Sequence, residues 1–517
     1  MIRSFLTVSS GTLASRLLGF LRDSMIAALL GTGAIADAFL VAFQFVNVIR
    51  RLLTEGALNA ALVPVWLRLR ETEGEAAAKK FAGSVLGTVA VALMALAVLI
   101  GLLMPLLITA LAPGFAGHET LRLAVGDARL MLPYLAFAGP ATVMLALSSA
   151  QGRFALTAFS PLLFNIALIA VMFALIVLGQ PSEFVALALA ATIGVAGFLQ
   201  LLILCLGRGG RMASPLRVSF GAEMRGFFAR AIPGMVASSG PQWLAVAGAV
   251  IASSSPSAVS WLYFANRLVE LPLGIVGVAM GTVLVPELTR ALRGGDKVAI
   301  AHAESRALEL AVGLALPATL GLIALSQPIV RLLFEHGAFT TEDTTATARA
   351  LVWLALGLPA QVLVKALSPA FFAREDTMTP LVATAKGFVV AIASAVLLGH
   401  FFGATGIAAG IALGAWSNAI GLIRRGSESF GFSIDAAARR RLPRIVAAAL
   451  LMGAALWLAA MFEAAPSAHG LVQGGVLLAL IAAGIAIYGL LLRLFGATSW
   501  RETVNAIRQT PSPDLRG

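Results

Sequence analysis

FAGSVLGTVAVALMALAVLIGLLMPLLITAL (81–111) decides the fold class of this chain, because it carries no charged side chain. A helix needs about 20 mostly apolar residues to cross the hydrocarbon core of a bilayer. Comparable runs follow one another along most of the 517 residues, of which 59% are hydrophobic and only 12% charged. A soluble protein keeps about a quarter of its residues charged. The sequence therefore predicts an all-α polytopic membrane protein, since helices satisfy their own backbone groups in lipid.

Charged residues, glycines and prolines divide the apolar sequence into about fourteen predicted transmembrane helices. Their approximate bounds are 5–30, 35–66, 81–111, 123–150, 158–179, 184–206, 227–252, 257–288, 304–325, 347–372, 378–399, 405–423, 444–462 and 471–494.

The loops between these spans alternate in charge. The basic loops contain Arg68, Arg70, Lys79, Lys80, Arg153, Arg208, Arg211, Arg217, Arg290, Arg293, Lys297, Arg374, Arg424, Arg425 and Arg439 to Arg441. The loops of the other set, such as GTGAIA (31–36) and GHFFGATG (399–406), are nearly free of basic residues, and Arg122 and Arg331 are exceptions near span ends. Because cytoplasmic loops are enriched in Lys and Arg, the basic loops and both termini are predicted to be cytoplasmic.

The chain contains an internal repeat. LAFAGPA (135–141) matches LALGLPA (354–360), and Pro161 matches Pro380 at the same offset. The repeat predicts two parallel six-helix lobes, 1–210 and 222–425, followed by two additional helices in 440–495 and a cytoplasmic tail, 496–517. Transporters with such repeats commonly bind substrate between them, near the middle of the membrane.

Several predicted spans contain charged side chains, each costing about 2.5–3.5 kcal/mol at mid-bilayer on insertion scales. These are Arg16, Arg22, Asp23, Asp37, Arg50, Arg51, Glu55, Arg267 and Glu270. Arg51 can pair with Glu55 along its helix, as Arg267 can with Glu270, and such pairs can simply hold helices together. Arg16, Arg22 and Arg50, with Arg267 as a fourth candidate, are then expected to lack acidic partners. Because guanidinium groups match phosphate oxygens, this surplus predicts an anionic ligand.

Other functional classes are less compatible with the sequence. The net charge of +12 is explained by cytoplasmic loops, and no loop is long enough for a nucleic-acid-binding module. The single cysteine and five scattered histidines predict neither a metal site nor a cofactor. A membrane enzyme would need clustered acids or a nucleophile beside a base, which the short loops lack. Lys365 and Lys386 can be neutral, reach an interface or act in coupling, and the sequence does not decide between these roles.

Four stretches resemble the MviN/MurJ lipid II flippases of the MOP transporter superfamily. They are SRLLGFLRD (15–23), DAFLVAF (37–43), NVIRRLLTEGALNAALVP (47–64) and YFANRLVELPLGIVGVAMGTVLVPEL (263–288). The resemblance implies two lobes in a V around a central cavity, with a groove for a polyprenyl tail on the last two helices. It also implies cavity arginines at Arg16, Arg22, Arg50 and Arg267, an acid at Asp23, and pattern matches at Asp37 and Glu55.

The implied function is a transporter and not an enzyme. It would move lipid II across the bacterial inner membrane by alternating access, for peptidoglycan synthesis and cell shape. The implied partners are lipid II and membrane lipids, with peptidoglycan-synthesis proteins as further candidates. A flippase for another polyprenyl-pyrophosphate glycan and a multidrug exporter of the same superfamily remain alternatives, although a cationic-drug exporter should concentrate acids in its cavity. No acid occurs in 231–252 or 381–399, so sodium coupling is not expected, and the membrane potential is the favoured energy source.

The predicted topology is testable by cysteine labelling. In a background with Cys205 replaced, a cysteine at position 340 should react with an impermeant reagent in intact spheroplasts, because 331–346 is predicted to lie outside. A cysteine in 424–443 should react only after permeabilisation. The topology is wrong if position 340 also requires permeabilisation.

Overall fold

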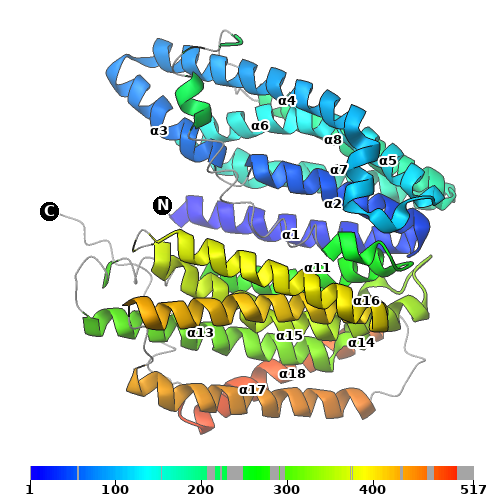
Figure 1. Cartoon of the computed structure of the whole chain (residues 1–517), viewed down its shortest axis with the longest axis vertical. Helices are drawn as coiled ribbons and strands as arrows, with labels where there is room; N and C mark the ends of the chain where they lie inside the picture. The colour runs from blue at the N-terminus through cyan, green and yellow to red at the C-terminus, as the bar shows by residue number, and fades with distance from the viewer. Residues whose placement is uncertain are drawn as a thin grey trace. The chain divides into compact units, whose positions relative to one another are not determined.

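Helices are the regular elements throughout the described part of the chain (Figure 1). The computed structural model describes residues 2–54, 57–152, 154–206, 216–219, 221, 224–229, 248–279, 290–291, 297–372, 374, 376–430, 435–462 and 471–497. Its helices are α1 (Ile2–Leu30), α2 (Ala34–Thr54), α3 (Ala57–Thr72), α4 (Glu75–Leu111), the 3-10 helix η1 (Pro113–Phe115), α5 (Glu119–Met131), α6 (Pro133–Ala150), α7 (Phe154–Leu178), α8 (Ser182–Leu206), α11 (Ala258–Ala279), α13 (Lys297–Ala324), α14 (Ser326–Phe334), α15 (Thr341–Phe372), α16 (Met378–Phe430), α17 (Ala436–Phe462) and α18 (Leu471–Leu494).

Eight helical segments of this described part are long and apolar enough to cross a membrane. Large apolar side chains cover their outer faces: Leu102 is 72% exposed, Phe402 66% and Leu478 68%. Such continuous apolar surface is suited to lipid and not to water. The predicted class, an all-α polytopic membrane protein, is confirmed. The predicted seventh span, 227–252, lies largely outside the described residues.

Two predicted spans each contain parts of two helices. The second, 35–66, contains α2, which ends at Thr54, and the start of α3, which begins at Ala57, and residues 55–56 lie outside the described residues. The fourth, 123–150, is formed by α5 and α6, which meet at Leu132. Pro133 follows this junction, and its missing N–H weakens helical hydrogen bonding there.

The eleventh and twelfth predicted spans form a tight antiparallel hairpin within α16. Gly403 has φ 56° and ψ −137°, a backbone conformation that glycine adopts without a Cβ clash. A Cβ at Gly410 would lie 2.4 Å from the Ala395 backbone nitrogen, and one at Gly414 would lie 2.4 Å from the Ala391 Cβ. The two halves therefore pack at backbone contact distance, as small residues allow in membrane helices.

The contacts divide the chain into two compact units, each described by itself below. Unit 1 comprises Met1–Tyr263 and Phe334–Asp343, and unit 2 comprises Phe264–Leu333 and Thr344–Gly517. The division passes through α11 and separates the first residues of α15 from the rest. The lobe boundaries inferred from the repeat, 1–210 and 222–425, stay a prediction.

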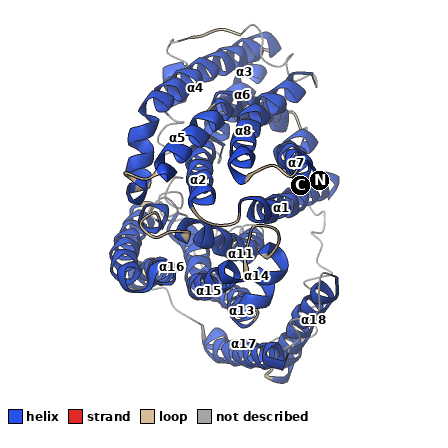
Figure 2. Cartoon of the chain, turned by 90° about the vertical axis from the view of Figure 1, so that its right-hand side faces the viewer, coloured by secondary structure: helices blue, strands red, loops and turns tan. Residues whose placement is uncertain are grey.

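The first of the two additional helices, α17, is docked on α13 within unit 2 (Figure 2). Asp435 begins this docking: its backbone N–H donates to Ser305 Oγ at 2.9 Å, and its carboxylate accepts the Ala438 N–H at 2.6 Å. The Ala438 hydrogen bond holds the pKa of Asp435 below its ordinary value. Arg441 lies 3.7 Å from Glu309 of α13. Polar groups at the start of α17 therefore fix its register against α13.

Candidate functional site

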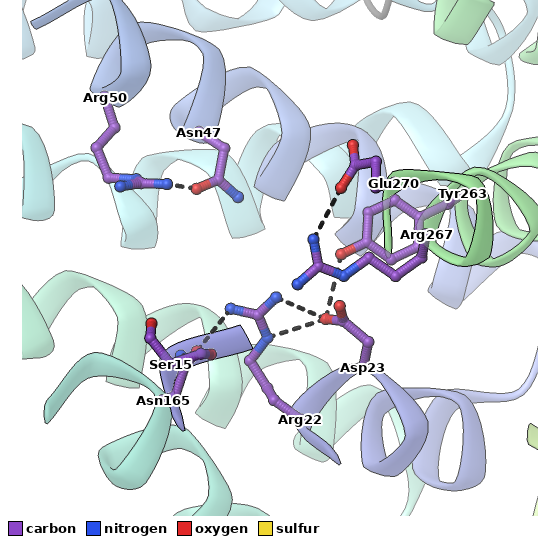
Figure 3. A network of polar contacts seen from close by, with 9 residues as sticks. All are labelled: Ser15, Arg22, Asp23, Asn47, Arg50, Asn165, Tyr263, Arg267 and Glu270. Carbon is purple, nitrogen blue, oxygen red and sulfur yellow. Dashed lines mark hydrogen bonds and ion pairs between the residues drawn. The ribbon is translucent and has the colours of Figure 1, made fainter. Parts of the chain in front are cut away.

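A buried polar cluster surrounds Arg22 in unit 1 (Figure 3). Arg22 lies on α1, and its Nε and Nη2 donate to Asp23 Oδ1 at 2.9 and 2.6 Å. Its Nη1 donates to Asn165 Oδ1 of α7 at 3.0 Å. The guanidinium also lies over the ring of Phe43 of α2, 5.1 Å from its centroid, and over that of Phe164 at 5.9 Å. All three of its nitrogens are engaged, so this arginine is held in one orientation.

Asp23 and Asn165 extend the cluster. The side chain of Asp23 is fully buried, and the Tyr263 hydroxyl of α11 donates to its Oδ1 at 3.3 Å. Asn165 Nδ2 donates to the backbone oxygen of Ser15 at 3.2 Å, which ties α7 to α1. The cluster thus joins three helices that are far apart in the sequence, in agreement with Figure 3.

The expectation that Arg22 lacks an acidic partner is wrong. Its partner is the adjacent residue, Asp23, and their side chains are 9% and 0% exposed. Helical spacing did not suggest this pair because neighbouring side chains point about 100° apart around a helix. The arginine side chain is long enough to turn back on Asp23, and low exposure strengthens their attraction.

Arg16 and Arg50 occupy different surroundings. Within the described part of the chain, Arg16 makes no hydrogen bond or ion pair, and its side chain is half-buried. Arg50 Nε donates to Asn47 Oδ1 at 3.1 Å, and its charge also acts on the buried Tyr134 hydroxyl of α6. Arg51 is half-buried, whereas its expected partner Glu55 lies outside the described residues.

Arg267 and Glu270 form the predicted pair in unit 2. Arg267 Nη1 donates to Glu270 Oε2 at 2.9 Å, and Asn266 Nδ2 donates to Glu270 Oε1 at 3.2 Å. The pair lies one to two turns beyond Tyr263 on α11. The two side chains are 24% and 35% exposed, so the pair is partly open to its surroundings.

Asp37 caps the start of α11. Its Oδ1 accepts hydrogen bonds from the backbone N–H of Ser260, at 2.9 Å, and from the Ser260 hydroxyl. Asp37 is 3% exposed and Ser260 is fully buried. The first N–H groups of a helix lack partners within the helix, and a carboxylate there also interacts favourably with the helix dipole. This sequence-predicted charge therefore connects α2 to α11.

A second carboxylate that the sequence analysis missed, Asp343, lies at the same ends of α1 and α11. Thr32 Oγ1 and Trp261 Nε1 donate to its Oδ1 at 2.6 and 3.0 Å, and Thr340 donates to its Oδ2. Thr340 and Asp343 form the T-x-x-D spacing of a capping box at the start of α15. That spacing, like the isolated polar residue Asn165 in an apolar span, was the available sequence signal.

No group of three or more potential metal-ligating side chains occurs among the residues described.

Replacing Asp37 by Ala should lower the free energy of unfolding by about 1–3 kcal/mol, because two buried donors of Ser260 lose their acceptor. The midpoint of thermal unfolding in detergent measures this effect. Asp37→Asn should keep part of the stability through its amide oxygen. Glu119→Ala is the matched control, since it removes only an exposed ion pair with Arg122. Equal midpoints for Asp37→Ala and Glu119→Ala would contradict the capping role.

Comparisons with known proteins agree with one another. The family model described as "Lipid II flippase MurJ" matches residues 26–473. A "Probable lipid II flippase MurJ" of Rhizobium tropici is 36% identical over 529 residues, covering 100% of this chain and 99% of the relative. "Lipid II flippase MurJ" of Burkholderia cenocepacia is 32% identical over 438 residues, covering 82% of this chain and 84% of the relative.

Solved structures share the fold. "Lipid II flippase MurJ, inward closed conformation" aligns with a TM-score of 0.79 at 22% identity, covering 96% of this chain and 100% of that one. A "multidrug resistance MATE family transporter of the MOP superfamily" in an inward-facing conformation aligns with a TM-score of 0.64 at 16% identity, covering 83% and 95%. At these identities the likeness shows the fold alone.

The relatives and the apolar helices together indicate a multi-pass protein of the bacterial inner membrane that is a transporter and not an enzyme. Because the family model spans most of the sequence, this chain belongs to the lipid II flippase MurJ family.

Proposed function

We propose that this protein carries lipid II from the cytoplasmic to the periplasmic leaflet, and that its arginines bind the pyrophosphate. The observation that carries the proposal is Arg16, a half-buried arginine on α1 that has no partner in the described part of the chain. A cation inside a membrane protein is costly without an anion. A pyrophosphate supplies several oxygens with the planar geometry that a guanidinium binds.

Arg22 contributes in a second way. It gives two N–H groups to one oxygen of Asp23, and phosphate oxygens would compete for the same two donors. Asn165 and the two aromatic rings would keep the guanidinium in place during this exchange. Arg50 and Arg267 are the further arginines that we assign to the pyrophosphate. Asp37, Arg51, Glu55 and Glu270 are assigned supporting roles.

We further propose alternating access by the two repeats, 1–210 and 222–425. Contacts at the predicted periplasmic ends of the helices support this mechanism: Asp37 binds Ser260, Asp343 binds Thr32, and the Ala338 N–H donates to the Ala28 oxygen at 2.8 Å. In this mechanism these contacts hold the outer helix ends of unit 1 together, and they break when the substrate is released on that side. The prenyl tail stays in lipid along residues 440–495 throughout the cycle.

A flippase for another polyprenyl-pyrophosphate glycan is the second candidate, because the same arginines suit its pyrophosphate. The decisive experiment depletes the protein in cells and measures how much lipid II is accessible on each face of the membrane. Lipid II should accumulate on the cytoplasmic face. Unchanged lipid II, with loss of a different prenyl-linked glycan from the outer face, would favour the second candidate.

Arg22→Lys should reduce lipid II export at least tenfold in a complementation assay. A lysine is a single point charge and cannot contact Asp23 and Asn165 while lying flat between two rings. Arg68→Lys, a change at an exposed arginine of α3, should leave export unchanged. Thermal unfolding of both purified variants checks that they fold. Full export by folded Arg22→Lys would contradict the assigned role.

Export should depend on the membrane potential and not on sodium. An elementary charge moved across the full field is worth about 2.3 kcal/mol per 100 mV, and Arg16 supplies such a charge when no substrate is bound. The interior-negative potential would draw the empty site towards the cytoplasm, and bound pyrophosphate would offset that pull. Export should therefore stop when the potential is collapsed at constant sodium. Loss of export on removing sodium at constant potential would overturn this prediction.

A further inference from the structure

A cleft of about 510 Å³ lies in unit 1 between the end of α4 and the start of α5, away from the arginine cluster. Pro105 of α4 and Leu121 and Val125 of α5 form apolar walls, and His118, Arg122 and Arg129 supply basic side chains. Figure 1 shows α5 beside the end of α4. Arg122 belongs to the predicted periplasmic side, where the other loops have few basic residues. The positive-inside rule therefore does not explain these cations.

A proline in α4 positions Arg129. Pro105 lies inside α4 and has no N–H, so the carbonyl of Gly101, four residues earlier, loses its helical hydrogen bond. Arg129 Nε donates to this carbonyl at 3.1 Å. The two terminal nitrogens of Arg129 make no hydrogen bond or ion pair within the described residues, and the side chain is exposed. The Nε edge of the guanidinium is thus held by the Gly101 carbonyl, and the two terminal nitrogens are available to bind a ligand.

The depth of Arg129 matches a lipid headgroup. The predicted span 81–111 is centred on Leu96, so Gly101 lies five residues, or about 7.5 Å, towards the outer end. From this depth a long arginine side chain can extend towards the headgroups at the edge of a hydrocarbon core about 30 Å thick. Exposed apolar side chains of the same helix, including Leu102 at 72% and Leu106 at 67%, form the lipid-facing surface beside the cleft.

The basic side chains lie along one face of α5 and of its N-cap residue, His118. His118, Arg122, Gly126 and Arg129 recur at helical spacing, and Gly126 leaves the surface between the two arginines open. A Cβ at Gly126 would meet no atom within 4 Å. Among the residues that the structure describes, Arg122 pairs with Glu119 alone, and the two side chains are 78% and 71% exposed. Such an exposed ion pair contributes little to stability, so another anion can replace Glu119 as the partner of Arg122.

We propose that this cleft binds the phosphate of an anionic phospholipid of the periplasmic leaflet, with Arg129 and Arg122 holding the headgroup and the acyl chains lying along α4. Phosphatidylglycerol is the chemical type, since its phosphate is negative and its headgroup carries no compensating cation. The proposal does not depend on the transported substrate.

Native mass spectrometry of the purified full-length protein, titrated with phosphatidylglycerol or phosphatidylcholine, tests this site. The unmodified protein should bind one phosphatidylglycerol at least tenfold more tightly than phosphatidylcholine. Arg122→Gln combined with Arg129→Gln should abolish this preference. Because that variant also removes the donor to Gly101, Gly126→Leu provides a second test: it keeps both arginines, suits a helix and fills the cleft.

Arg68→Gln removes one exposed positive charge elsewhere in unit 1 and should keep the tenfold preference. An equal loss in Arg68→Gln would show general charge attraction and overturn the site. Retained preference in both cleft variants would overturn it as well. Inorganic phosphate should not displace the lipid, and displacement would mean that the cleft takes free phosphate in place of a phospholipid.

Discussion

In hydrocarbon, each polar group must find its partner inside the protein, and this constraint organises the whole chain. It explains why the described elements are helices, whose backbone groups pair internally. It explains why the carbonyl exposed by Pro105 receives the Arg129 side chain. The same constraint surrounds the Arg22 guanidinium with a carboxylate, an amide oxygen and two aromatic rings. A polar group inside the membrane whose hydrogen-bonding or charge partners are not all supplied by the protein, such as Arg16, is therefore a candidate for binding the substrate.

The fold class was predictable because it depends on the length and periodicity of apolar runs. The hairpin in α16 was predictable as two spans, since Gly403 lies in a short uncharged loop. The division of the fourth predicted span, 123–150, into α5 and α6 was not, because the apolar residues continue across Leu132. Apolar content measures compatibility with lipid and does not show where a helix bends.

The candidate site was predictable in its residues and not in its contacts. The cost of intramembrane charge singled out Arg16, Arg22 and Asp23, and the i,i+3 rule gave the Arg267–Glu270 pair correctly. Spacing along one helix contains no information about partners on other helices. Asn165, Tyr263 and Ser260 became visible as partners only in three dimensions. The fold itself is shared with multidrug transporters, so the polar groups, and not the helix arrangement, distinguish what is carried.

The glycine-lined hairpin of α16 has a consequence for how the protein is made. Its two halves touch backbone to backbone through Gly410 and Gly414, with a turn centred on Gly403. A turn this short leaves no length of chain to bridge two separately placed helices. We therefore expect the pair to enter the bilayer as one unit, with Met378 and Phe430 on the same side. A bulky residue at Gly410 or Gly414 would force the two halves apart, so such a change would impair the assembly of this hairpin in the bilayer before it affected any transport step.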